Sequence, residues 1–161
     1  MSVRLHIASG SAEETLHIGA ELGRRLQPGD ALLLTGDLGA GKTTLTQGIA
    51  LGLDVPERPR SPTFVMATEY EGRLPLYHLD LYRVEDLGEL GELGLDEYLI
   101  SDGVTVVEWA DRAPHAFPAH SLWVDLQASG EDGRDITVSC AEPRNPAVAE
   151  WLEQTSAARS V

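Results

Sequence analysis

The spacing of apolar residues predicts seven short strands along the chain. Short apolar runs and two-residue alternation are typical of strands, because successive side chains of a strand point to opposite faces. Such segments lie near residues 5–7 and at 31–34, 64–70, 73–81, 104–107, 122–127 and 135–140. A short turn separates the third and fourth segments, which predicts a β-hairpin. The last two predict a terminal hairpin within about residues 121–140.

Helices are predicted between these strands, where apolar residues recur with helical spacing. Ser11 and Glu14 have the spacing of a capping box at a helix start, which is also a candidate neighbour of a bound base. Residues 44–53 predict a second helix, and a last helix is expected from Pro146 into a polar tail. The apolar face of the first helix comprises Leu16, Ala20, Leu22 and Leu26.

Residues 85–100 combine leucines, acidic residues and three glycines. Because glycine lowers helix propensity, we expect one or two short helices here. Core packing with a charged, solvated back is the favoured interpretation, and a partner-docking surface is the alternative.

The length and composition favour one soluble domain. At 161 residues, the chain suffices for one well-buried core, so residues 1–161 are interpreted as a single domain. No apolar run approaches the roughly 18 residues of a membrane span, and polar residues near the start interrupt any signal-peptide core. We therefore expect a cytoplasmic protein without membrane contact. The single cysteine, Cys140, cannot form an internal disulfide and is expected at a half-buried strand position.

The chain is strongly acidic, with 26 acidic and 12 basic side chains and a formal net charge of -14. This charge argues against a broad nucleic-acid surface, so any connection with RNA is expected to be indirect. A nucleoside triphosphate is also an anion. The unfavourable overall field therefore makes a cation such as Mg²⁺ more necessary at a nucleotide site.

The strand at residues 31–34 leads into a segment with the phosphate-binding P-loop pattern, Gly36-x-x-x-x-Gly41-Lys42-Thr43. Glycines let backbone N–H groups converge on phosphate oxygens, an expected exposed Lys42 supplies positive charge, and the Thr43 hydroxyl can ligate Mg²⁺. A glycine-rich turn that fits by chance is the alternative. The candidate nucleotide-binding residues are Gly36, Asp37, Leu38, Gly39, Ala40, Gly41, Lys42, Thr43 and Thr44.

Two carboxylates follow apolar strand residues. Asp80 resembles the strand-end aspartate that holds Mg²⁺ in P-loop enzymes, and Glu108 could position either Mg²⁺ or the attacking water. Trp109 either walls the phosphate site or fills the core. His78 shares a strand face with Asp80. It either packs toward the site or is an ordinary hydrogen-bonded sheet residue, and the second interpretation is favoured.

A further candidate is the turn that follows Arg58 and Arg60. Ser61, Pro62 and Thr63 stand where a switch-like loop would need them, although an ordinary capped turn fits the spacing equally well.

Four segments in this order closely resemble the TsaE (YjeE) family of small bacterial ATPases. They are residues 36–44, Ser-Pro-Thr-Phe at 61–64, His-x-Asp-Leu-Tyr-Arg at 78–83 and Val-Glu-Trp-Ala-Asp-Arg at 107–112. The resemblance runs from about the first predicted helix to Arg112.

The resemblance implies a P-loop α/β fold, with a central parallel sheet flanked by antiparallel strands. It implies an ATPase that acts on a TsaD–TsaB synthase heterodimer in threonylcarbamoyl modification of tRNA adenosine 37. By motif, residues 36–44 would bind the phosphates of ATP, and Thr43, Asp80 and Glu108 would surround Mg²⁺. Residues 61–63 would form a mobile loop near the γ-phosphate, and Trp109 would lie close to the nucleotide. Lys42, Asp80 and Glu108 are the catalytic candidates.

Slow hydrolysis by the isolated protein and stimulation by a partner are expected, because no cis arginine finger is evident. The arginines available for that role are Arg58, Arg60, Arg83 and Arg112. Guanine is disfavoured since the usual Asn-Lys-x-Asp pattern is absent, Asn145 being the only asparagine. Two other functions share the P-loop: a small-molecule kinase, and a nucleotide-dependent interaction module with negligible catalysis.

Overall fold

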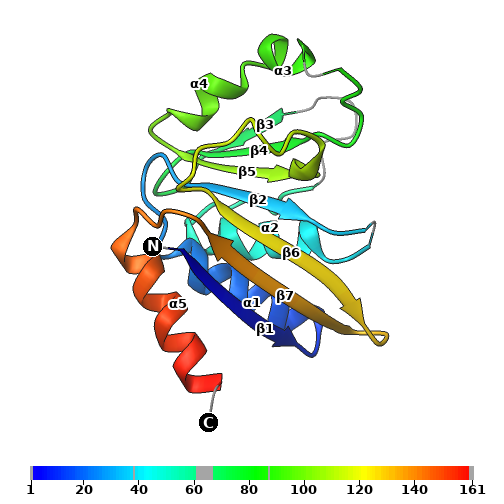
Figure 1. Cartoon of the computed structure of the whole chain (residues 1–161), viewed down its shortest axis with the longest axis vertical. Coiled ribbons are helices and arrows are strands. Elements are labelled where there is room, and N and C mark those ends of the chain that lie inside the picture. The colour runs from blue at the N-terminus through cyan, green and yellow to red at the C-terminus, as the bar shows by residue number, and fades with distance from the viewer. Residues whose placement is uncertain (1, 38, 61–66, 87, 160–161) are drawn as a thin grey trace.

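Seven strands form one sheet in the order β1-β7-β6-β2-β5-β4-β3 (Figure 1). The computed structural model describes residues 2–37, 39–60, 67–86 and 88–159. The four central strands are parallel: β6 (Leu122–Ser129), β2 (Ala31–Thr35), β5 (Val104–Glu108) and β4 (Leu76–Asp80). Antiparallel strands flank them: β7 (Gly133–Cys140) and β1 (Val3–Ser9) at one edge, and β3 (Ala67–Tyr70) at the other. The predicted α/β class and sheet arrangement are confirmed.

Helices cover both faces of this sheet, and the two faces contribute to separate hydrophobic clusters. In β2, Leu32 and Leu34 belong to one cluster, whereas Ala31 and Leu33 belong to the other. The first cluster lies under α1 (Ala12–Gly23), α2 (Lys42–Gly52) and α5 (Pro146–Arg159). The second lies under α3 (Gly88–Leu93), α4 (Leu95–Leu99) and the 3₁₀ helix η1 (Ala110–Arg112). The acidic segment at 85–100 thus forms two short helices that contribute leucines to the core, as predicted.

The terminal hairpin exists, but its place in the sheet was not predicted. Strand β6 pairs in parallel with β2, so the hairpin completes the central sheet beside the P-loop strand. The first predicted helix is also too long, because α1 ends at Gly23 and Leu26 is buried beyond its end. Conversely, α2 begins at Lys42, two residues before the predicted start.

Helices α1 and α2 cross at four glycines, Gly19, Gly23, Gly48 and Gly52. A Cβ atom at Gly48 would lie 2.1 Å from the Leu16 carbonyl oxygen, and one at Gly23 would lie 2.4 Å from the Ile49 carbonyl oxygen. Real Cβ atoms essentially never approach backbone so closely. The glycines therefore let α1 lie directly against the helix that follows the P-loop.

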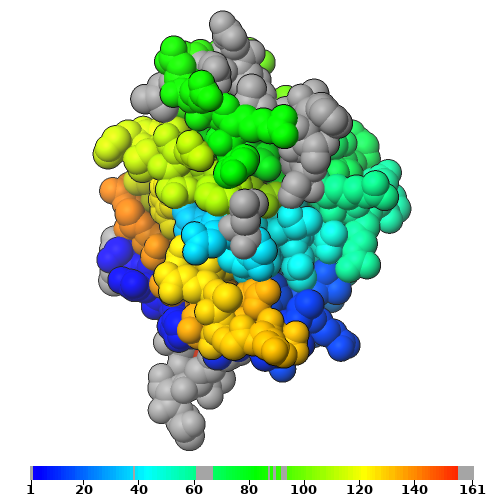
Figure 2. Space-filling model, turned by 90° about the vertical axis from the view of Figure 1, so that its right-hand side faces the viewer, coloured from blue at the N-terminus to red at the C-terminus, as the bar shows by residue number. Residues whose placement is uncertain are grey.

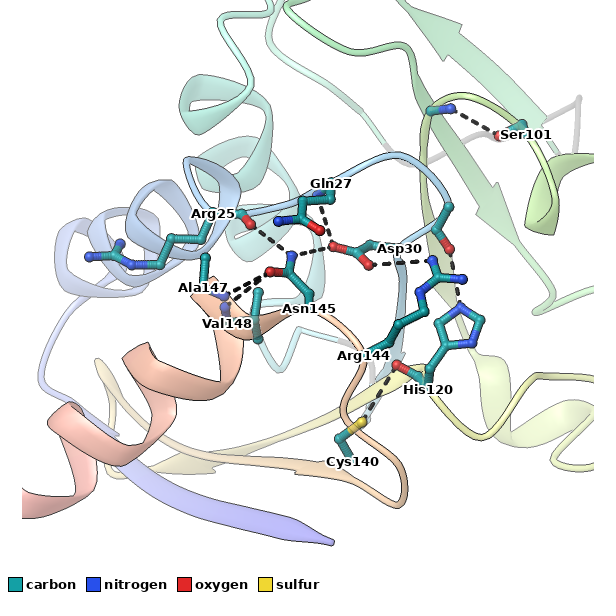
Figure 3. A network of polar contacts seen from close by, with 12 residues as sticks. Arg25, Gln27, Asp30, Ser101, His120, Cys140, Arg144, Asn145, Ala147 and Val148 are labelled. Carbon is teal, nitrogen blue, oxygen red and sulfur yellow. Dashed lines mark hydrogen bonds and ion pairs between the residues drawn. The ribbon is translucent and has the colours of Figure 1, made fainter. Parts of the chain in front are cut away.

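A polar network fixes α5 at the opposite end of the sheet from the P-loop (Figure 3). The Asn145 side-chain amide donates to the Arg25 carbonyl oxygen at 2.8 Å and to Asp30 Oδ2 at 2.7 Å. Its Oδ1 accepts from the Ala147 and Val148 amides, at 3.0 and 3.3 Å. Asn145 thus caps α5 and joins it to the turn that precedes β2.

Two expectations from composition concern the fold. Within the described part of the chain, none of the helices is both long enough and apolar enough to cross a membrane. Cys140 ends strand β7, as a strand residue, but it is fully buried rather than half-buried.

Candidate functional site

The P-loop connects the end of β2 to the start of α2 and occupies the centre of the face shown in Figure 2. Gly36, Gly39 and Gly41 have φ angles of 134°, 78° and 102°. These angles lie in the region that side chains with a Cβ rarely adopt, so the glycines are required by the turn itself. A Cβ atom at Gly36 would also lie 2.3 Å from the Leu126 carbonyl oxygen of β6. Leu38 lies outside the described residues.

Lys42 is buried, with 5% of its surface exposed, so the expectation of an exposed loop lysine is wrong. Its Nζ donates to the carbonyl oxygens of Gly36 and Asp37, the latter at 3.1 Å. The same amine lies 3.7 Å from the ring centroid of Trp109, which covers it. Burial lowers the pKa of Lys42 below its ordinary value, although nearby carboxylates, Glu108 above all, oppose that shift.

The two predicted strand-end acids lie side by side. Asp80 and Glu108 are paired in the register of the adjacent parallel strands β4 and β5. Thr43, at the start of α2, places its Oγ1 3.5 Å from Glu108 Oε1. Burial raises the pKa of the Asp80 carboxyl above its ordinary value, and the charge of Glu108 adds to this rise, while a 2.9 Å hydrogen bond from the Tyr82 amide opposes it. The structure therefore brings Thr43, Asp80 and Glu108 together.

His78 combines both interpretations that the sequence left open. It is a fully buried residue of β4, and its Nε2 lies 2.5 Å from Glu108 Oε2. The favoured view of an ordinary sheet residue is incomplete, because the hydrogen-bond partner is a candidate site residue. A single strand pattern could not identify this partner, which lies 30 residues away in the sequence.

Trp109 fits both interpretations that the sequence left open: its ring lies over Lys42 beside the P-loop, and it is a partly buried residue that packs against the second hydrophobic cluster. Its φ of 59° is unusual for a residue with a Cβ. The ring packs 4.9 Å from that of Tyr82, centroid to centroid, and lies over Lys42. Sequence reasoning assigned no role to Tyr82; its position two residues after Asp80 was the available signal.

Among the described residues, two hollows adjoin the P-loop. An open cleft of about 730 Å³ lies between P-loop residues and a wall that includes Trp109, Asp111, Trp123 and Asp125. A smaller hollow of about 70 Å³ joins the start of α1 to Gly41, Thr44 and Arg134. The start of α1 therefore lies beside the P-loop, and its proximity to a bound base stays a prediction.

The terminal hairpin contributes residues that sequence reasoning missed. A guanidinium nitrogen of Arg134 donates to the carbonyl oxygen of Gly39 at 3.1 Å, and Asp125 Oδ1 accepts from Thr35 Oγ1 at 2.7 Å. Figure 2 shows the β6–β7 turn, in yellow and orange, directly beside the P-loop. No sequence motif marked these residues, because their proximity depends on the pairing of β6 with β2.

The predicted switch loop cannot be placed in the site. Ser61, Pro62 and Thr63 lie outside the described residues. Their proposed proximity to the γ-phosphate stays a prediction from the resemblance.

The oxygen-bearing side chains at this site fit a Mg²⁺ ion whose remaining ligands come from a bound nucleotide. Thr43, Asp80 and Glu108 offer oxygen atoms, which Mg²⁺ prefers. Over the ranges that the structure describes, no group of three or more His, Cys, Asp or Glu side chains is arranged to hold a metal. Because Mg²⁺ is commonly held by one or two carboxylates together with phosphates and water, these residues fit a metal bound with its nucleotide.

Comparisons with known proteins show which family and which solved structure this chain is similar to. Residues 9–136 match the family described as threonylcarbamoyl adenosine biosynthesis protein TsaE. The tRNA threonylcarbamoyladenosine biosynthesis protein TsaE of Bacillus subtilis is 44% identical over 143 residues, covering 88% of this chain and 89% of that protein. Its counterpart in Nostoc is 50% identical over 132 residues, covering 79% and 80%. The crystal structure of Bacillus subtilis YdiB matches with a TM-score of 0.81 and 38% identity, covering 96% of this chain and 97% of YdiB.

Proposed function

The chain belongs to the TsaE family of tRNA threonylcarbamoyladenosine biosynthesis proteins, and from this premise we propose that it is a magnesium-dependent ATPase. It acts with a TsaD–TsaB-type synthase complex and meets tRNA only through that complex. One observation carries the proposal: the helix that follows the P-loop begins beside two strand-end carboxylates. Thr43 of this helix faces Glu108, and Asp80 is paired with Glu108 in the adjacent strand.

The P-loop binds the phosphates of ATP. Its backbone turns at three glycines with left-handed φ angles, and α2 begins directly at Lys42. A helix N-terminus offers unpaired N–H groups and the positive end of its dipole, both of which favour an anion. The Lys42 amine, held at the carbonyl oxygens of Gly36 and Asp37, exchanges those neutral acceptors for phosphate oxygens when ATP binds.

The Mg²⁺ ion that accompanies ATP would be held by Thr43, Asp80 and Glu108. When bound, Mg²⁺ supplies charge neutralisation and orientation of the phosphates. Glu108 either completes the metal shell or orients the attacking water. Phosphoryl transfer needs little covalent help, so positioning and charge neutralisation account for the catalysis.

The partner supplies what the isolated site lacks. Lys42 and the P-loop amides are positive groups at the phosphates. Among the described arginines, Arg134 contacts the P-loop at the Gly39 carbonyl oxygen, and none makes a hydrogen bond or ion pair with Asp80 or Glu108. A trans-acting arginine typically contributes about 10³- to 10⁵-fold in rate. Hydrolysis is therefore slow in the isolated protein and stimulated by the synthase pair.

Glu108→Ala separates the ATPase from an interaction module without catalysis. The variant should keep nucleotide and partner binding but lose ATP hydrolysis and tRNA modification in a reconstituted system. Full tRNA modification by a variant that no longer hydrolyses ATP would favour the interaction module. Transfer of a labelled γ-phosphate to a metabolite instead of water would favour a small-molecule kinase.

A further inference from the structure

His78 connects the two strands that carry the strand-end acids. It stands two residues before Asp80 in β4, on the same face of the sheet, and is paired in register with Val106 of β5. From there its Nε2 reaches Glu108 Oε2, two residues further along β5. The imidazole has no exposed surface, and 3% of the Glu108 side chain is exposed.

The two oxygens of the Glu108 carboxylate have different neighbours. Oε2 lies 2.5 Å from His78, whereas Oε1 lies 3.5 Å from the Thr43 hydroxyl at the start of α2. A glutamate at the end of a strand has several side-chain rotamers, and fixing one of them costs conformational entropy. The short contact with His78 offsets this cost and holds Oε1 toward the P-loop.

The surroundings of the imidazole indicate which nitrogen carries the proton. His78 Nδ1 is buried and has no hydrogen-bond partner among the described residues. A buried donor without a partner is costly, so a tautomer with its proton on Nε2 rather than on Nδ1 suits this position. In that tautomer, Nε2–H donates to the Glu108 carboxylate.

We propose that His78 is a positioning residue, which holds Glu108 so that one carboxylate oxygen faces Thr43 and the metal side of the nucleotide. The proposal rests on the proposed function, because the orientation matters only if Glu108 serves metal-bound ATP. Residues that orient a metal ligand typically affect metal affinity or activity about 10- to 100-fold when they are replaced. A histidine that only fills space in the sheet would have no such effect if its volume were kept.

Two substitutions separate orientation from packing. His78→Phe keeps a ring but removes the donor, whereas His78→Gln places an amide donor at a similar reach. His120→Phe is the matched control, because His120 contacts the Gly29 carbonyl oxygen at the far end of the sheet, at 3.3 Å. Each variant is compared with the wild type in ADP affinity without metal, in Mn²⁺ affinity of the ADP complex by electron paramagnetic resonance, and in kcat and KM for ATP.

In His78→Phe, Mn²⁺ affinity and kcat should each fall by about 10- to 100-fold. Metal-free ADP affinity should stay unchanged, since His78 makes no hydrogen bond to the described P-loop residues. KM for ATP in the presence of Mg²⁺ should rise with the loss of metal affinity, because the two affinities are linked. His78→Gln should recover most of the loss, and His120→Phe should behave as the wild type.

Wild-type Mn²⁺ affinity and kcat in a folded His78→Phe protein would overturn the proposal. Equal impairment of His78→Gln and His78→Phe would overturn it as well, because it would indicate a packing role. Nitrogen NMR of the wild-type imidazole tests the same contact if His78→Phe does not fold: a proton on Nε2 supports the proposal, and a proton on Nδ1 contradicts it. A wild-type protein whose ADP complex binds no metal would instead refute the proposed function, and with it the need to orient Glu108.

Discussion

Lys42 is the only lysine of the chain, and it stands at the point where the P-loop, Trp109 and the acidic side chains meet. Burial lowers the pKa of its amine, so a larger fraction is neutral at mildly alkaline pH than for an exposed lysine. The neutral amine is the form that reacts with acylating reagents. ATP would exchange the carbonyl partners of this amine for phosphate oxygens and favour its charged form.

We therefore expect Lys42 to become reactive toward acylating reagents at a lower pH than exposed lysines do. Mg²⁺ and ATP should suppress this reaction. Mass spectrometry of acetylated peptides measures both effects, and the N-terminal amine is an internal control that ATP should not protect. Equal labelling of Lys42 with and without nucleotide would contradict its role at the phosphates.

Asp80 carries a stability cost at neutral pH. Burial raises the pKa of its carboxyl, so the folded protein binds this proton more tightly than the unfolded chain does. The resulting stabilisation is present below the unfolded-state pKa and is lost as the pH rises through the folded-state pKa. Without nucleotide and metal, the charged Asp80 therefore lowers the free energy of unfolding at neutral pH.

Asp80→Asn should raise the free energy of unfolding at neutral pH while abolishing hydrolysis, and the gain should shrink as the pH falls toward the ordinary carboxyl range. Urea unfolding in the presence of EDTA over a pH series measures this. Glu153→Gln, at an exposed position on α5, is the control and should show little change. A loss of stability in Asp80→Asn at neutral pH would refute the assignment.

At the scale of elements, local patterns predicted what lies close in sequence. The strand β2, the P-loop and the helix α2 form one continuous segment, so their pattern was sufficient. The pairing of β6 with β2 was not predictable, because the Thr35–Asp125 hydrogen bond joins residues 90 positions apart. The partner of His78 and the burial of Lys42 under Trp109 likewise depend on contacts between elements.

The crossing of α1 and α2 gives a test of packing at this scale. Gly48→Ala places a Cβ against the Leu16 backbone and should lower the free energy of unfolding by about 1–3 kcal/mol, despite the helix preference of alanine. Gly91→Ala in α3 is the matched control. Among the described residues, no atom outside its own helix turn lies within 4 Å of the added Cβ, so a gain of up to about 1 kcal/mol is expected. Urea unfolding midpoints measure both. A neutral Gly48→Ala would show that the helices can separate without cost.

For the whole molecule, the site follows from the order of the strands. After β2 the chain passes to β4 and β5 on one side of it, and then to β6 on the other. Crevices at such reversals, beyond the carboxyl ends of parallel strands, are where open α/β sheets bind ligands. The P-loop occupies this place, with Asp80 and Glu108 at the ends of the neighbouring strands.

The net charge of -14 affects which macromolecules the protein can bind. An acidic surface repels the phosphates of a nucleic acid, which supports our proposal that tRNA is met through a protein complex and not bound directly. Family membership and the fold could be predicted from the sequence motifs. The positions of His78, Asp125 and Arg134 around the site required the folded chain.

The measurement that tests the account most directly is the rate of phosphate release from ATP and Mg²⁺, with and without a TsaD–TsaB-type synthase pair. The account predicts slow release by the protein alone and strong stimulation by the pair, with Glu108→Ala inactive in both conditions. Rapid release by the isolated protein, with no increase when the pair is added, would contradict it.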